Sequence, residues 1–191
     1  METIKEEIKE LLNKLVSPYR LKHIMGVAYM SKILANLYGV SELKAEIAAF
    51  GHDLFRDVKP YRFLNMAKSY GLELSKVEVK NPILLHGKIA AEFLKKKYNI
   101  CNDIYEAIYF HTSGCKCFNT NIIGKILFIS DSIEPTRNYE NVEYLRELAK
   151  RDIEKAYIEI LKNKIIYAIE KKHLLLYETV EAWNYNIMEV E

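Results

Sequence analysis

Hydrophobic residues recur at three- and four-residue spacing along almost the whole of this 191-residue chain. That spacing places apolar side chains on one face of an α-helix, and the strict alternation typical of a half-buried strand is scarce. Only 7 glycines and 4 prolines interrupt the pattern. The chain is therefore predicted to be all-α, and a helical bundle is the architecture that such helices favour.

Nine helices are predicted from this periodicity and from the signals at its breaks. Gly39 stops the second helix, Ser41 can cap the third, and Pro82 suits the first turn of the fifth. The segment 112–120 is predicted to be the least regular part. The predicted ranges are 3–16, 19–37, 42–55, 60–70, 82–97, 102–112, 121–133, 140–172 and 176–187.

The chain is predicted to form a single domain over residues 1–191. Its length fits one domain, half its residues are hydrophobic, and it contains no linker, internal repeat or shift in composition. Residues 19–137 carry the motifs described below, and the helices predicted over 140–187 complete the domain.

Charge and hydropathy argue against nucleic-acid and membrane partners. The formal net charge is only +2, so no strong electrostatic attraction to nucleic acid is expected. No apolar run approaches the roughly 18 residues that a membrane span needs. The first residues are amphipathic and acidic, which predicts a first helix and not a signal peptide.

The cysteine content predicts a cytoplasmic protein with reduced thiols. Three cysteines are an odd number and do not indicate a disulfide framework. Cys115 and Cys117 form a C-x-C pair that is able to bind metal or oxidise. Because no second pair accompanies them, we interpret them as two thiols that share a loop by chance.

Six residues of metal-ligand type project from apolar helices. A histidine on an apolar helix is usually an ordinary core residue, but four of them with two aspartates indicate a metal site, since buried charges are normally paired or bound to metal. Imidazole and carboxylate suit Fe, Mn, Co, Ni or Zn. His173 follows two lysines at a helix end and is predicted to be structural. The six candidate ligands are His23, His52, Asp53, His86, His111 and Asp131.

The adjacent pair His52-Asp53 can serve one site only if the helix ends or is distorted there. Neighbouring side chains on a helix point roughly 100° apart, so both reach one site only at a helix end or a distortion. Gly51 and the nearby end of the apolar pattern supply such a setting. The order His, His-Asp, His, His, Asp on separate helices is a much stronger signal than the doublet alone.

These motifs resemble the HD superfamily of metal-dependent phosphohydrolases. The resemblance is closest to the bacterial YqeK-type family of symmetrical bis(5'-nucleosyl)-tetraphosphatases, and it covers residues 19–168. The segment with SDSIEPTR is its most specific part. The matching segments are RLKHIMGVAYMSKILANLYGV, AEIAAFGHDLFRDV, NPILLHGKIAAEFL, AIYFHTSG and ISDSIEPTRNYENVEYLRELAKRDIEKA.

The resemblance implies that the six candidate ligands hold two metal ions, with iron as the metal. Asp53 would bridge the ions, His23, His52 and Asp131 would complete one site, and His86 with His111 the other. The implied reaction is hydrolysis of diadenosine tetraphosphate to two ADP molecules by a water that the two ions activate. The resemblance also permits a homodimer.

Three arginines are predicted to offset the charge of the phosphate chain. Arg56 is predicted to be catalytic together with Asp53, and it stands where the family usually has lysine. Arg20 and Arg137 are predicted to bind substrate. Thr112 is predicted to bind substrate or to support His111, and Glu134 to support Asp131.

Two other functions remain open from the sequence. The first is a different nucleotide phosphohydrolase of the same superfamily, a deoxynucleotidase or a phosphodiesterase, which would use nearly the same ligands. The second is a non-catalytic nucleotide- or metal-binding regulatory module. A missing ligand would favour the second function, and none is missing.

Overall fold

The computed structural model describes residues 1–188, so the last three residues of the predicted domain lie outside it. Within that range the chain forms eleven α-helices and three short 3-10 turns, with no strand, which confirms the predicted all-α bundle. No helix of this range is both long and apolar enough to cross a membrane. The helices are α1 (Glu2–Leu15), α2 (Pro18–Leu37), α3 (Glu42–His52), α4 (Phe63–Ser69), α5 (Lys76–Lys80), α6 (His86–Tyr98), α7 (Asn102–Phe110), α8 (Ile122–Ile133), α9 (Val142–Arg151), α10 (Ile153–Glu170) and α11 (Tyr177–Met188).

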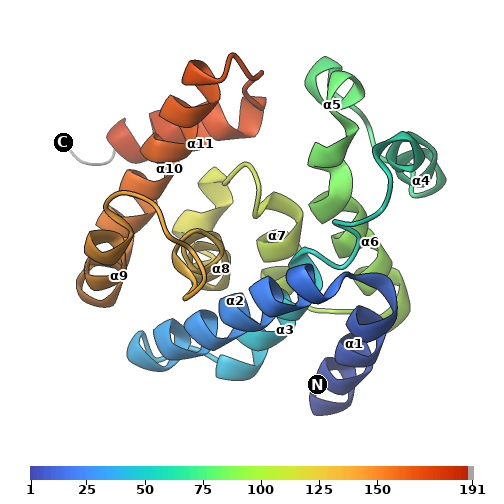
Figure 1. The fold of residues 1–191 in the computed structure, drawn as a ribbon, viewed down its shortest axis with the longest axis horizontal. Coiled ribbons are helices and arrows are strands. Elements are labelled where there is room, and N and C mark those ends of the chain that lie inside the picture. Colours follow the sequence, from blue (N-terminus) through green and yellow to red (C-terminus); the bar gives the residue numbers. More distant parts are fainter. Residues whose placement is uncertain (189–191) are drawn as a thin grey trace.

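Helices α7 and α8 lie at the centre of the bundle (Figure 1). Helix α8 packs against α2 and α10, and α7 packs against α3 and α6. Helices α4 and α5 extend the molecule on the α6 side, and α9 to α11 extend it on the other side. The five helices α2, α3, α6, α7 and α8 therefore surround one interior, to which each contributes an apolar face.

The buried faces of these five helices form the main hydrophobic core. Ile24, Ile47, Leu94, Ile108 and Phe128, one from each helix, are all fully buried within one cluster. Burying each such side chain contributes about 1.5–3 kcal/mol before the loss of conformational entropy. Polar side chains that point into this interior are consequently held on rigid supports.

Side-chain caps fix where the central helices begin. Ser17 accepts a hydrogen bond from the backbone N–H of Arg20, ahead of Pro18 in the first turn of α2. Ser41 caps α3 as predicted, by accepting from the N–H of Lys44. Such caps satisfy N–H groups that have no partner within the helix.

Two of the predicted helices are too long. The helix predicted over 42–55 ends at His52, and Asp53 adopts φ −108° and ψ 18° as its C-cap. The helix predicted over 140–172 is broken at Asp152, which is extended and whose carboxylate caps α10 by accepting from the N–H of Lys155. The apolar periodicity continues across this break, so the break cannot be detected from periodicity alone.

The segment 60–85 is more divided than predicted. Pro60–Arg62 and Pro82–Leu85 are 3-10 turns that precede α4 and α6. The short helix α5 was not predicted. Its signal in the sequence is a capping box, in which Ser75 and Glu78 each accept a hydrogen bond from the other's backbone N–H.

The prediction of reduced thiols is wrong for Cys115 and Cys117, which the structure joins in a disulfide. Their Cα atoms lie 5.1 Å apart, within the range that a disulfide spans. Cys115 precedes the 3-10 turn Lys116–Asn119, in the segment predicted to be irregular. Cys101 is a free, exposed thiol.

Candidate metal centre

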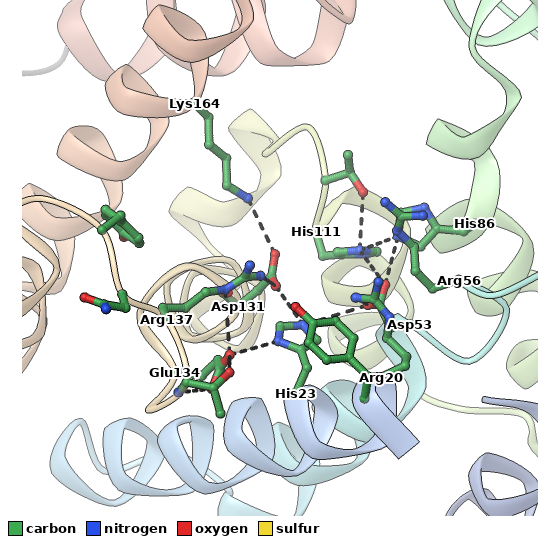
Figure 2. A pocket seen from close by; sticks show the side chains of 15 residues that line it. Arg20, His23, Asp53, Arg56, His86, His111, Asp131, Glu134, Arg137 and Lys164 are labelled. Carbon is green, nitrogen blue, oxygen red and sulfur yellow. Dashed lines mark hydrogen bonds and ion pairs between the residues drawn. The ribbon is translucent and has the colours of Figure 1, made fainter. Parts of the chain in front are cut away.

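A cavity of about 490 Å³ opens between α2, α6, α8 and α10, and five of the six predicted ligands line it (Figure 2). The sixth, His52, does not line the cavity and is completely buried. The predicted substrate-binding residues Arg20, Arg56, Thr112 and Arg137 line the same cavity. Residues from across the sequence are thus brought to one place.

Helix ends aim several of these side chains. His52 is the last residue of α3, and Asp53 leaves the helical path as its C-cap, so Asp53 lines the cavity while a ring nitrogen of the fully buried His52 lies within 4.8 Å of ligand-type atoms of His23 and Asp131. His86 is the first residue of α6, and His111 directly follows α7. His23 and Asp131 lie within α2 and α8.

The ligand-type atoms fall into two groups. His23, His52 and Asp131 form one group, and Asp53, His86 and His111 form the other; within each group the atoms lie within 4.8 Å of one another. Asp53 faces both groups, since Oδ2 lies 3.8 Å from His23 Nε2 and Oδ1 lies 3.1 Å from His86 Nε2. This is the arrangement of two adjacent cation sites with a shared carboxylate.

The hydrogen bonds of the four histidines determine which ring nitrogen faces the cavity. Nδ1 of His52, His86 and His111 lies 2.6–2.7 Å from the carbonyl oxygens of Ala49, Ile83 and Ile108. A carbonyl oxygen can only accept, so each Nδ1 carries a proton and donates it. His23 Nδ1 lies 3.1 Å from Glu134 Oε1, which holds its ring in the same way. In the neutral tautomer, every Nε2 therefore presents a lone pair inward.

These lone pairs fit a metal and little else. Nε2 of His23 and of His52 are buried and have no hydrogen-bond partner among the described residues. The Nε2 atoms of His86 and His111 lie 2.9 Å apart, so two lone pairs would face each other without a proton or a cation between them. Imidazole nitrogens and carboxylate oxygens are typical ligands of divalent transition metals. A metal-bound histidine typically donates its other ring N–H to a carbonyl or carboxylate oxygen, as the Nδ1 atoms do here.

Electrostatics favour the cation-binding form of Asp53, Asp131 and His111, whereas at His23 burial is outweighed by contacts with Asp131 and Glu134, which raise its pKa. Burial by itself would raise the pKa of Asp53, but the adjacent His52 and His86 hold it well below its usual value. Asp131 behaves alike: burial opposes ionisation, and contacts with His23 and Lys164 lower its pKa. Burial lowers the pKa of His111, and His86 beside it lowers it further. Both carboxylates are thus ionised and His111 is neutral at neutral pH.

Four cations surround the ligands on two sides (Figure 2). On one side, Arg20 Nη1 lies 2.7 Å from Asp53 Oδ2. On the other, Arg137 Nη2 lies 2.9 Å from Asp131 Oδ1, and Lys164 Nζ lies 3.7 Å from Asp131 Oδ2. Arg56 is the fourth cation, on the side of Arg20.

Arg56 is the cation whose charge is least engaged. Its side chain lines the cavity and has no ion pair or side-chain hydrogen bond anywhere in residues 1–188. Its possible acidic partners face elsewhere, because Asp57 accepts from the N–H of Ser17 and Glu46 lies 3.5 Å from Lys5 Nζ. The guanidinium is therefore available to an anionic ligand.

Three residues near the ligands were not predicted from the sequence. Lys164 lies on α10, outside any motif. A Cβ at Gly87 would lie 2.6 Å from His111 Cε1, and one at Gly26 would lie 2.5 Å from Glu134 Oε2, so both glycines make room for site residues. No sequence signal identified them, since close approach depends on tertiary packing.

Arg146 was also missed, and it holds the loop that follows α8. Its guanidinium donates to the carbonyl oxygens of Ile133, Glu134 and Arg137 at 2.8–3.0 Å. Thr136 in turn donates to Glu134, which holds His23. Thr112 Oγ1 lies 3.3 Å from His111 Nε2.

The fifth histidine, His173, is exposed and lies outside the cavity, where its ring contacts that of Tyr167.

An all-α bundle with two groups of histidine and aspartate at its centre defines a class of metal-dependent hydrolases. Residues 20–136 match the family described as HD domain, which is more than half of the chain. The chain belongs to this HD-domain family, and relatives that match it over nearly its whole length define its place within the family.

These relatives come from several bacteria. The chain is 33% identical to a protein of Halalkalibacterium halodurans named "Bis(5'-nucleosyl)-tetraphosphatase, symmetrical", over 94% of this chain and 95% of that protein. It is 27% identical to a Bacillus subtilis protein of the same name, over 95% and 96%. A crystal structure from Clostridium acetobutylicum, described as a predicted HD superfamily hydrolase involved in NAD metabolism, is 33% identical, with a TM-score of 0.90 over 96% of this chain and 97% of that one.

Proposed function

We propose that this protein hydrolyses diadenosine tetraphosphate symmetrically to two ADP molecules, with a pair of metal ions in the centre described above. The observation that carries the proposal is the convergence of four histidine rings and two ionised carboxylates in two adjacent groups, five of whose six residues line one cavity. The names of the full-length relatives support the substrate.

Two metal ions, when bound, supply an activated water and polarise the phosphoryl oxygens. His23, His52 and Asp131 would hold one ion and His86 with His111 the other, with Asp53 shared between them. No protein nucleophile is needed, and none of the described residues lining the cavity is a cysteine or serine.

The cations of this chain bind and orient the polyphosphate. Arg20 and Arg56 lie on one side of the ligands, and Arg137 and Lys164 lie on the other. A symmetrical substrate has two phosphates on each side of the bond that breaks, so a cavity with cations on both sides suits it. Arginine offers a phosphate two parallel hydrogen bonds.

Three further features are part of the proposal. Iron is the metal that we propose, because of the resemblance to the tetraphosphatase family and because the ligand set suits it. We propose a cytoplasmic location, as expected for hydrolysis of a nucleotide of the cell interior. A homodimer is compatible with exposed apolar side chains on the first and last helices, such as Leu15 and Met188.

A substrate panel tests the proposed activity against its superfamily alternatives. Metal-loaded protein is incubated with diadenosine tetraphosphate, a deoxynucleoside monophosphate and a cyclic dinucleotide, and the products are separated by chromatography. We expect ADP as the product from the first compound, at a rate far above those for the other two. Faster release of phosphate from the deoxynucleotide would favour the deoxynucleotidase function instead.

A further inference from the structure

A second cavity of about 570 Å³ adjoins the metal-ligand cavity, beside α10. The two cavities share Asp131, Arg137, Tyr139 and Lys164, so they form one continuous depression. We call the second cavity the α10 groove. Part of it comes from residues beyond 136, where the match to the HD domain ends.

The side chains of the α10 groove are of the kind that binds a planar base. Tyr139 and Tyr167 present exposed aromatic rings, and Ile160, which is buried, provides an apolar floor. Asn141 and Asn163 add amide groups that can both donate and accept. Aromatic faces for stacking with a few polar groups at the edges are typical of sites that bind nucleobases.

The cationic side chains of the groove, Lys164 and Arg137, lie where it meets the metal-ligand cavity, and Glu140 adds a carboxylate that lines the groove alone. Lys164 Nζ lies 3.7 Å from Asp131 Oδ2 and 4.0 Å from the centre of the Phe128 ring, and it points from α10 toward the ligands (Figure 2). Tyr167 lies three residues further along the same helix, on the same side. The groove thus offers a cation next to the metal ligands and an aromatic ring beyond it.

This order of groups matches the order of groups in a nucleotide. The phosphates would lie against Lys164 and Arg137, and the base would lie beyond them against Tyr167. We propose that the α10 groove binds one nucleoside of a dinucleoside polyphosphate, so that the helix outside the HD-domain match selects dinucleoside substrates. This inference rests on the proposed function and adds the position of one half of the substrate.

The test removes the aromatic ring and leaves the metal ligands untouched. Tyr167→Ala, Tyr167→Phe and Asn163→Ala are compared with Tyr177→Ala, which removes a tyrosine exposed on α11 outside both cavities. KM and kcat are measured for diadenosine tetraphosphate, with metal content and thermal midpoint measured alongside. Since a stacked base loses roughly tenfold or more in affinity when its aromatic partner becomes alanine, Tyr167→Ala is expected to raise KM about tenfold.

The other measurements separate a nucleoside contact from a structural role. Tyr167→Phe is expected to keep the KM of the wild type, because it keeps the ring, and Tyr177→Ala is expected to keep it too. kcat and metal content should stay within about twofold in all variants. A KM for Tyr167→Ala within twofold of wild type, or an equal rise for Tyr177→Ala, overturns the inference while the wild type still produces ADP. A wild type that produces no ADP overturns the proposed function itself.

Discussion

The four buried histidines share one local arrangement, in which Nδ1 faces an acceptor of the chain and Nε2 faces the interior. The acceptors are three backbone carbonyls and one carboxylate. A carbonyl three residues earlier in the chain is available only where the histidine sits at a helix turn or end, as His52, His86 and His111 do. The positions of helix ends therefore decide which ring nitrogen of His52, His86 and His111 carries the proton in the neutral ring, and which one is free to bind a metal.

Asp53 is the residue on which both groups of ligands depend. We expect Asp53→Ala to abolish hydrolysis, by at least about 10²-fold, and to lower metal content in both sites. The reason is that the carboxylate both contacts the two groups and offsets the repulsion between two cations. Elemental analysis and steady-state kinetics check this, with His173→Ala as the control that keeps both properties. Equal losses in the two variants would contradict the assignment.

Arg56 is expected to act through its charge. Arg56→Lys should keep substantial activity because a cation remains, whereas Arg56→Ala should lose on the order of 10²-fold, the scale for removing one contact to developing charge. Metal content should be unchanged in both variants, since a protonated guanidinium is no ligand. Kinetics on both proteins, with metal analysis, make the comparison. Wild-type turnover and substrate affinity in the alanine variant would remove Arg56 from the site.

Gly87 is expected to be necessary for the position of His111. A methyl group at residue 87 would lie 2.6–2.7 Å from the ring atoms of His111, so Gly87→Ala must displace the imidazole. We expect metal content to fall toward one ion per chain while helical content stays at the wild-type level, because alanine favours a helix. Elemental analysis with circular dichroism measures both. If Gly87→Ala retained two ions at wild-type affinity, displacement of the His111 ring would have no effect on metal binding, and the expectation would be wrong.

At the scale of elements, two ion pairs of the buried Lys88 join three helices outside the site. Lys88 on α6 lies 2.7 Å from Glu78 on α5 and 2.9 Å from Glu178 on α11. The side chains of Lys88 and Glu78 are almost fully buried. Burial would raise the pKa of Glu78, but the hydrogen bonds from Lys88 and Ser75 lower it below its usual value. These contacts anchor the short helix α5 and the last helix, α11, to the bundle.

Removing Lys88 should destabilise the fold in a way that depends on pH. We expect Lys88→Met to lower the free energy of unfolding by about 3–5 kcal/mol at neutral pH, because it leaves Glu78 buried and unpaired. In the wild type, the stabilisation from the lowered pKa is present above about pH 4.5 and is lost as pH falls through the folded-state pKa of Glu78. In the variant, protonation of Glu78 relieves the cost, so the difference between the two proteins should shrink on acidification.

Denaturant unfolding from pH 7 to pH 4 measures this difference. Lys150→Met is the matched control, since Lys150 pairs with Glu147 on the exposed face of α9, and it should cost less than about 1 kcal/mol. A Lys88→Met deficit that stays constant with pH would contradict the role given to Glu78.

For the whole molecule, the sequence predicted the fold class, and the six candidate ligands that it singled out lie close together in the structure, but several helix boundaries and supporting residues were missed. Three- and four-residue spacing predicts helices well, yet it ran through Asp152, where a carboxylate caps a new helix. The candidate ligands could be identified because burying polar or charged side chains in apolar segments costs free energy unless they are paired or bind a metal. Lys164, Gly26 and Gly87 gave no such signal, since their roles come from contacts between helices distant in sequence. The disulfide between Cys115 and Cys117 was missed because the odd number of cysteines was given more weight than the short separation of these two residues.

The position of bond cleavage tests the central claim most directly. Metal-loaded protein is incubated with diadenosine tetraphosphate in ¹⁸O-labelled water, and the products are analysed by mass spectrometry. Attack of water at one of the two central phosphorus atoms, with the ADP on the other side of the central bridge as the leaving group, predicts ADP as the sole nucleotide product, with one ¹⁸O atom on the terminal phosphate of one ADP in each pair. AMP together with ATP, or no hydrolysis at a metal content of two ions per chain, would contradict the account.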